Sequence, residues 1–312
     1  MKHANHLFIV NPAAGKGIAV GLKTRIEELF QKILERYPDT TYEIITTQYP
    51  GHATEIARDY SARGTYRIYA VGGDGTANEV LNGMADSNSS LGCIPGGTGN
   101  DFVQYISGDF HRDEILRETI LGEVEVIDVG MVNEKYFLNV ASVGFDAKVN
   151  YKAMLFKGKP LIGPKLAYYS GILASLNVLS PLTVNIHQGT TTRSAEVFMI
   201  TVANGQIYGG GFHIAPQARI TDGLFDIIEV APLSFLKIVK YMPMLKRGTH
   251  LGLPEVSSYK TDRLQITSDH DFYVNIDGET SLSKDVDFRL RAKKINMIVP
   301  RSLRERFDKD DI

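Results

Sequence analysis

This 312-residue sequence has little cysteine and no excess of charge of either sign. Cys93 is its only cysteine, which excludes an intramolecular disulfide and a zinc site built from several thiolates. Such low cysteine content is typical of a protein in a reducing cytosol. Lys and Arg number 34 against 36 Asp and Glu, so the chain as a whole has no strong attraction for nucleic acid.

Long hydrophobic runs are also missing. The first apolar stretch covers only residues 7–10, which is far short of the apolar region of a secretory signal. A longer uncharged stretch, residues 166–184, has the length of a membrane span but contains several Ser, Thr, Asn and Pro. We interpret it as a soluble helix followed by a strand.

The chain does contain enough apolar residues for two cores, since 43% of its residues are hydrophobic. Over residues 1–124, strand patterns (7–10, 42–46, 68–71 and 92–94) alternate with helix patterns (18–33, 52–62 and 76–84). This alternation predicts an α/β domain in which helices cover a parallel sheet.

The rhythm changes after about residue 124. Helix patterns near 165–179 and 234–245 interrupt many short strand patterns, which lie at 126–129, 136–140, 183–187, 196–202, 225–230, 264–267, 272–276 and 288–290. We predict a β-rich second domain, a sandwich or flattened barrel, over residues 125–295. The segment from about 296 to 312 is expected to pack back on the first domain, with a solvated charged end.

Three glycine-rich turns follow strand patterns. They are Asn-Pro-Ala-Ala-Gly-Lys-Gly at 11–17, Gly-Gly-Asp-Gly-Thr-Ala-Asn-Glu at 72–79 and Pro-Gly-Gly-Thr-Gly-Asn-Asp at 95–101. Glycine lets a backbone approach a phosphate closely, and a following helix N-terminus adds partial positive charge. A single turn of this kind would be compatible with a tight turn alone. Neither the P-loop spacing nor the dinucleotide pattern fits, because Asn11 and Asn78 stand where glycines are needed.

Together the three turns resemble the signature turns of the diacylglycerol kinase catalytic-domain family, which includes bacterial soluble lipid kinases and sphingosine kinases. A late Asn-Ile-Asp-Gly-Glu at 275–279 resembles the terminal Asp-Gly-Glu element of that family, so the resemblance covers nearly the whole chain. It implies that the first domain has a phosphofructokinase-like or NAD kinase-like fold. It also implies that the protein uses ATP and Mg²⁺ as cofactors. By this resemblance the ATP-contacting positions are Asn11, Thr47, Gly73, Asp74, Gly75, Thr76 and Thr98. For Thr47 the alternative is a threonine that only ends a strand. Lys16 could approach a phosphate as a point charge, and an ordinary exposed lysine is the alternative there.

Carboxylates supply the ligands that phosphoryl transfer needs for magnesium. The resemblance assigns Asp74, Asp101 and Asp128 to a water-mediated magnesium network near the phosphates, where turn or cap residues would be the plain alternative. It also implies a structural magnesium site made by Asp222 with the carbonyls of Arg219 and Leu224, and a plain turn without metal is the alternative.

The acceptor hydroxyl must lose a proton, and a carboxylate can take it. The resemblance places the catalytic base at Asp277 or Glu279, with the other residue in support. From spacing alone this pair would be a hairpin turn, because Asp-Gly favours one.

Residues 147–195 contain no acidic residue, and their basic residues are interleaved with apolar ones: Lys148, Lys152, Lys157, Lys159, Lys165 and Arg193. This composition suits docking on anionic lipid, and a solvated basic loop is the alternative. The resemblance therefore implies a cytoplasmic lipid kinase on the inner face of the membrane. It would be a homodimer without nucleic acid partners and would convert diacylglycerol to phosphatidic acid. An NAD kinase-like enzyme and a non-catalytic nucleotide sensor are the alternatives.

Overall fold

The structure is a computed structural model that describes residues 4–97, 99–107, 112–156 and 181–300. The chain divides into two compact units, and each is described by itself. Unit 1 consists of residues 1–127 and 293–312, and unit 2 consists of residues 128–292. Two strands, β5 (Glu123–Val132) and β16 (Glu279–Val299), belong partly to each unit.

Unit 1 is built on a parallel sheet with the strand order β2-β1-β3-β4-β16. Its strands other than β16 are β1 (Asn5–Val10), β2 (Thr41–Thr46), β3 (Tyr66–Gly72) and β4 (Ser90–Pro95), each at a predicted strand position. β1, β3 and β4 are largely buried, as expected for parallel strands covered on both faces. At the far edge, Asn296 and Met297 of β16 pair with Ser90 and Leu91.

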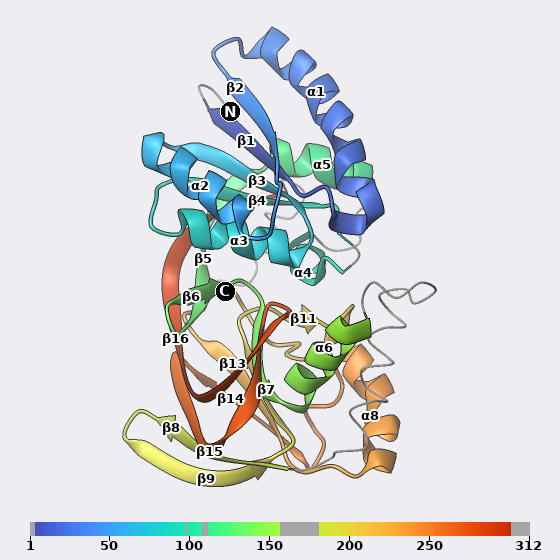
Figure 1. Ribbon diagram of the computed structural model, residues 1–312, viewed down its shortest axis with the longest axis vertical. Coiled ribbons are helices and arrows are strands. Elements are labelled where there is room, and N and C mark those ends of the chain that lie inside the picture. Colours follow the sequence, from blue (N-terminus) through green and yellow to red (C-terminus); the bar gives the residue numbers. More distant parts are fainter. Residues whose placement is uncertain (1–3, 98, 108–111, 157–180, 301–312) are drawn as a thin grey trace. The chain divides into compact units, whose positions relative to one another are not determined.

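Helices cover this sheet (Figure 1). The predicted helices are observed as α1 (Ile18–Arg36), α2 (His52–Arg63) and α3 (Asp74–Met84). α1 buries Leu22, Ile26, Phe30 and Ile33 at steps of three and four, and it ends two residues before Pro38. Two helices that periodicity did not predict, α4 (Asp101–Ser107) and α5 (Arg112–Ile120), are too short to show a repeat. Side chains of α1 and α5 pack with Phe8 and Tyr69 in one core.

Unit 2 is built on an antiparallel sheet with the strand order β14-β13-β10-β7-β15-β16. A hairpin of β8 and β9 pairs with β15, and β6 pairs with β5. The strands of this sheet and hairpin are β6 (Lys135–Phe137), β7 (Val140–Gly144), β8 (Leu182–Gln188), β9 (Thr191–Val197), β10 (Met199–Ala203), β13 (Phe225–Val230), β14 (Val256–Thr261) and β15 (Arg263–Ile276). β11 (Ile207–Tyr208) and β12 (Phe212–His213) form a separate small ribbon.

Four predicted strands in unit 2 need correction. The strand predicted at 136–140 is two strands, because the backbone N–H groups of residues 138–140 bind the Asp277 carboxylate. The strand predicted at 196–202 is also two strands, with the change of partner at Phe198, whose N–H binds the Val230 carbonyl. Conversely, the strands predicted at 264–267 and 272–276 belong to β15, with an irregular register between them.

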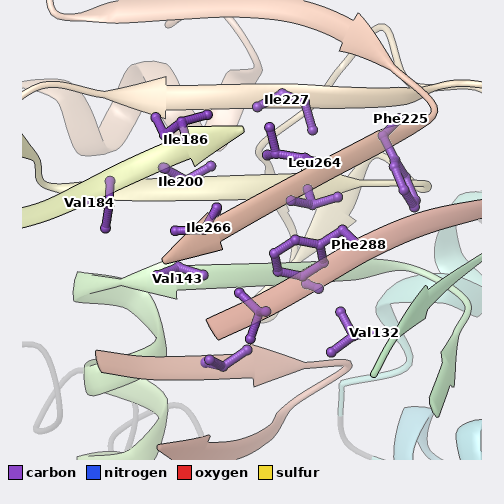
Figure 2. Packing of buried hydrophobic residues seen from close by; sticks show 14 of the residues in the cluster. Val132, Val143, Val184, Ile186, Ile200, Phe225, Ile227, Leu264, Ile266 and Phe288 are labelled. Carbon is purple, nitrogen blue, oxygen red and sulfur yellow. The ribbon is translucent and has the colours of Figure 1, made fainter. Parts of the chain in front are cut away.

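The main core of unit 2 is formed by buried side chains from several strands of this sheet and from the β8–β9 hairpin (Figure 2). Ile200 and Ile227 lie on neighbouring strands and meet Leu264 and Ile266 of β15, while Phe288 of β16 is fully buried in the same cluster. Because each strand places alternate side chains inward, hydrophobic burial fixes the register of the whole sheet.

Two helices of unit 2 are described. α6 (Phe145–Phe156) follows β7 directly, and α8 (Phe235–Arg247) agrees with the helix predicted at 234–245. The helix predicted at 165–179 lies outside the described residues. Within the described part of the chain, no helix combines the length and the hydropathy of a membrane span.

Candidate functional site

The three glycine turns meet at the carboxyl ends of the strands in unit 1. The N–H groups of Gly96 and Gly97 donate to the Gly72 carbonyl at 2.8 and 3.0 Å. A Cβ on Gly15 would lie 2.1 Å from the Gly96 carbonyl oxygen, and a Cβ on Gly97 would lie 2.6 Å from the Gly73 Cα. These glycines are therefore required by backbone contacts between the turns, and the turns form one continuous group in which Gly96 and Gly97 are buried and Gly75 is exposed. The Lys16 side chain and Thr98 lie outside what the structure describes.

Gly97→Ala is expected to destabilise the protein by about 1–3 kcal/mol and to weaken binding of the ATP that the family resemblance implies, because the added methyl group must push two backbones apart. Gly21→Ala is the matched control, since a Cβ there meets nothing within 4 Å. Because Gly21 is in the interior of α1, that change should raise stability by about 0.5–1 kcal/mol. Urea unfolding and calorimetric titration with ATP measure both effects. Equal behaviour of the two variants would refute this account of the turns.

A pocket beside these turns contains three of the predicted nucleotide-contacting residues. Asn11, Thr47 and Thr76 line a cavity with about 580 Å³ of empty space, part of it open to solvent. The Asn11 side-chain amide donates to the Thr76 hydroxyl at 3.0 Å, and its carbonyl oxygen accepts the Ala13 N–H at 3.0 Å. Asn11 thus joins the first glycine turn to the N-terminus of α3, where Gly75 is exposed.

The pocket also includes residues that motif analysis missed. Gln48, Tyr49 and Pro50 form one wall, and the Glu79 carboxylate accepts the Ala53 N–H at 3.2 Å on another. Tyr49 stacks on His52 with ring centroids 4.5 Å apart, and its side chain is 50% exposed. Residues 48–50 contain no glycine or acidic motif. The only sequence signal in this segment was an aromatic residue, Tyr49, shortly after a predicted strand.

Asp74 and Asp101 lie together at the start of α4. The two carboxylate oxygens of Asp74 accept the N–H groups of Asp101 and Phe102 at 3.1 and 3.2 Å, and Asp101 is buried. No group of three or more His, Cys, Asp or Glu side chains in the described residues could hold a metal ion by itself. Magnesium in phosphoryl transfer needs no such group, because one or two carboxylates with water and phosphate oxygens suffice. The donor set therefore fits magnesium that arrives with a nucleotide.

Asp128 occupies a different environment, in unit 2. It is 1% exposed, and its carboxylate accepts the Gly223 N–H at 2.7 Å while its own N–H donates to the Ile220 carbonyl at 2.7 Å. Within unit 2, Asp128 anchors the turn that contains Asp222. This structural role was not part of the sequence interpretation.

The Asp222 turn does not fit a magnesium ion. Lys260 lies 2.7 Å from the Asp222 carboxylate and 3.0 Å from that of Asp226, and the other Asp222 oxygen accepts the Leu224 N–H. The ammonium group therefore already supplies the positive charge that the resemblance assigned to a metal, and an ion bound to Asp222, Arg219 and Leu224 would have to displace it.

We expect the midpoint of thermal unfolding of the wild-type protein to be the same in EDTA and in MgCl₂, because Lys260 neutralises the Asp222 turn. Lys260→Met should lower that midpoint and make it rise with added Mg²⁺, since two carboxylates are then left without a cation. Scanning calorimetry without nucleotide measures both proteins. A wild-type midpoint that rises with Mg²⁺ would restore the metal site.

Asp277 and Glu279 differ in their contacts although they lie two residues apart. Asp277 and Gly278 have φ values of 46° and 93°, as in a two-residue hairpin turn between β15 and β16. The Asp277 carboxylate accepts the N–H groups of Leu138, Asn139 and Val140 at 2.7, 3.1 and 3.1 Å. Glu279 is exposed, and its side chain makes no hydrogen bond or ion pair with any described residue.

The basic and apolar segment predicted to dock on lipid is only partly described. Residues 157–180 and the side chains of 152–156 lie outside the description. Arg193 is described and forms an ion pair with Glu229, which also accepts the Tyr259 hydroxyl. Arg193 is thus held on unit 2, and we remove it from the predicted docking surface.

Two family models match the chain. The model described as diacylglycerol kinase catalytic domain matches residues 5–132, and the one described as YegS C-terminal NAD kinase beta sandwich-like domain matches residues 139–301. Together they cover both units.

Similar proteins extend over the full chain. A diacylglycerol kinase of Bacillus subtilis (strain 168) is 30% identical over 315 residues, covering 99% of this chain and 100% of the relative. A diacylglycerol kinase of Staphylococcus saprophyticus is 28% identical over 299 residues, covering 95% of this chain and 96% of the relative. A crystal structure of a diacylglycerol kinase from Bacillus anthracis str. Sterne has a TM-score of 0.69 at 21% identity, covering 96% and 98%. Another structure from that strain reaches 0.76 at 24%, covering 97% of both chains.

Proposed function

Because the chain belongs to the diacylglycerol kinase catalytic-domain family, we propose that it transfers the γ-phosphoryl group of ATP to a lipid hydroxyl, with diacylglycerol as the acceptor and phosphatidic acid as the product. Membership of this family identifies the protein as a kinase and supports its assignment to the lipid kinases. We therefore do not retain the NAD kinase-like or sensor alternatives.

One observation supports ATP as the phosphoryl donor more than any other. Three glycine turns touch one another through backbone atoms, next to a pocket that contains Asn11, Thr47 and Thr76. Backbone N–H groups at the α3 N-terminus suit a phosphate chain, and the adjoining pocket suits the nucleoside. Asn11 would hold the two parts in register through its bond to Thr76.

Glu279 is our candidate for the catalytic base. The Asp277 carboxylate is committed to three N–H groups, whereas the Glu279 carboxylate is exposed. In the proposed step, Glu279 accepts the proton of the lipid hydroxyl while that oxygen attacks the γ-phosphorus. The bond from the γ-phosphorus to the bridging oxygen breaks, and ADP leaves.

Magnesium bound with ATP would neutralise charge on the β- and γ-phosphate oxygens. Asp74 and Asp101 would hold it, directly or through water, because the Asp74 carboxylate accepts the backbone N–H of Asp101, the first residue of α4. We further infer a cytoplasmic homodimer that associates with the inner face of the membrane, where its lipid acceptor is found.

The test is a kinase assay with the purified full chain. The protein is incubated with radiolabelled ATP and Mg²⁺ and with diacylglycerol, NAD or a total lipid extract, and the product is identified by mass. We expect labelled phosphatidic acid and no NADP. Labelling of a sphingoid, prenol or monoacyl lipid in place of diacylglycerol would change the acceptor, and absence of label in every lipid would refute the function.

A further inference from the structure

Unit 1 contains a wide groove between α1 and the segment that joins α5 to β5. Its lining comes from the last two turns of α1, from Tyr37 directly after them, and from Arg117, Leu121 and Glu123. The groove holds about 1260 Å³ of empty space, part of it open to solvent. In Figure 1, α1 and α5 lie beside each other, and side chains of both helices pack in one core to which Ile33 of the lining belongs. Both walls of the groove are thus part of unit 1.

This groove is separate from the pocket beside the glycine turns. α1 begins at Ile18, directly after the first glycine turn, and the lining residues Lys32 and Arg36 lie near its other end. At about 1.5 Å of rise per residue, these two positions are about 21 and 27 Å along the helix from Ile18. The two pockets have no lining residue in common. A ligand in the groove would therefore leave the nucleotide pocket free.

Positive charge dominates the lining. Lys32, Arg36 and Arg117 are exposed cations, and Glu123 is the one acidic residue of the lining. Within the described part of the chain, none of the three cations forms an ion pair. The two arginines come from different helices, and each guanidinium group can donate two parallel hydrogen bonds to a phosphate. The groove therefore has the charge and the donors to bind a phosphate group.

Arg67 adds a further positive charge behind one wall. Its guanidinium donates to the Gly122 carbonyl at 2.7 Å and to the Tyr69 hydroxyl at 3.1 Å, and Gly122 lies between Leu121 and Glu123 of the lining. The Tyr69 hydroxyl also lies 3.0 Å from Nδ1 of the buried His6. Burial and the charge of Arg67 lower the pKa of His6 to about 3, so the His6 ring is neutral. Arg67 thus holds the backbone of this wall and raises the positive potential near it.

The rest of the lining is apolar. Ile33 is 6% exposed, and Leu29, Tyr37 and Leu121 are half-buried. The Arg36 guanidinium lies over the Tyr37 ring, 5.7 Å from its centroid. An inorganic anion would leave these apolar side chains in water, whereas an acyl chain would cover them and gain from their burial. The combination fits a ligand with an anionic head and an apolar chain.

We propose that this groove is a second ligand site, which binds a lipid whose head group is a phosphate monoester. Lys32, Arg36 and Arg117 surround the phosphate, and the apolar side chains of the lining contact the acyl chains. A monoester suits three cations better than a diester does, because it carries close to two negative charges at neutral pH. Phosphatidic acid belongs to this class. The inference goes beyond the proposed function and does not require turnover.

The test is calorimetric titration of the full chain with dihexanoyl phosphatidic acid, dihexanoylglycerol and inorganic phosphate, each below the concentration at which it forms micelles. Combined replacement by Arg36→Gln and Arg117→Gln should weaken one phosphatidic acid site by about 10-fold or more, since charge-assisted hydrogen bonds from two side chains are lost. It should not change the binding of dihexanoylglycerol. Leu29→Ser should weaken phosphatidic acid and leave inorganic phosphate unchanged.

Lys23→Gln is the matched control. It removes one positive charge from an exposed position of the same helix that does not line the groove, so the affinity for phosphatidic acid should stay the same. All of the replaced cations are exposed, and urea unfolding should show the same stability for these variants and the wild-type protein.

Three results would overturn the inference. They are an unchanged phosphatidic acid isotherm in the double variant, an equal loss in Lys23→Gln, and inorganic phosphate that binds as tightly as the lipid. The binding measurement and the kinase assay fail independently. Groove binding without phosphorylation of any lipid refutes the proposed function alone, and phosphorylation without groove binding refutes the second site alone.

Discussion

Glu279→Gln is expected to lower the turnover of lipid phosphorylation by about 10²–10⁴-fold, which is the usual contribution of a general base. Glutamine keeps the shape of the side chain but cannot accept the proton of the attacking hydroxyl. Because Glu279 is exposed and has no bond to any described residue, the free energy of unfolding and the affinity for ATP should not change. Single-turnover kinetics and calorimetric titration with ATP measure the two quantities.

Asp277→Asn is the matched comparison, and it should behave differently. An amide retains one acceptor oxygen for three N–H groups, so at least one of the contacts to residues 138–140 is lost. The expected cost is about 1–3 kcal/mol in the free energy of unfolding, with activity falling because the hairpin moves. A destabilised Glu279→Gln, or a fully stable and inactive Asp277→Asn, would exchange the roles of the two carboxylates.

Asp146→Asn is expected to stabilise the protein in neutral solution, and the gain should depend on pH. Burial raises the pKa of Asp146 to about 6 from its ordinary value of 3.8, so the native state holds the proton more tightly than the unfolded state. Stability from this group is therefore present at low pH and is lost as pH rises from about 4 to 6. Above pH 7 the lost stability amounts to about 3 kcal/mol, at 1.36 kcal/mol for each pKa unit.

Urea unfolding of both proteins between pH 4.5 and pH 8 measures this effect as a difference. The difference in unfolding free energy should increase up to about pH 6 and then remain constant. The slope is more informative than the absolute value, because the amide that Asp146→Asn introduces has buried donors that need partners of their own. A difference that is flat with pH would mean that burial does not raise the pKa of Asp146.

The residues alone were sufficient for the main architecture. Alternation of strand and helix patterns predicted the parallel sheet of unit 1, and α1 follows the spacing of Leu22, Ile26 and Ile33. The β-rich character of unit 2 was also predicted. Local patterns succeeded here because burial of one face fixes the period of a helix or strand. They failed for α4, α5 and α6, which are short or have no clear apolar face.

Some residues of the candidate site were also predicted from the sequence, and others were identified only in the tertiary structure. The family resemblance carried by the motifs selected Asn11, Gly73 and Thr76 and grouped Asp277 with Glu279, whereas spacing alone favoured a hairpin turn for that pair. Only the tertiary structure distinguished Glu279 from Asp277, placed Lys260 against Asp222 and brought Asp146 to an apolar pocket. Each of these depends on a partner that is distant in sequence, and the state of a carboxylate is decided by what surrounds it in space.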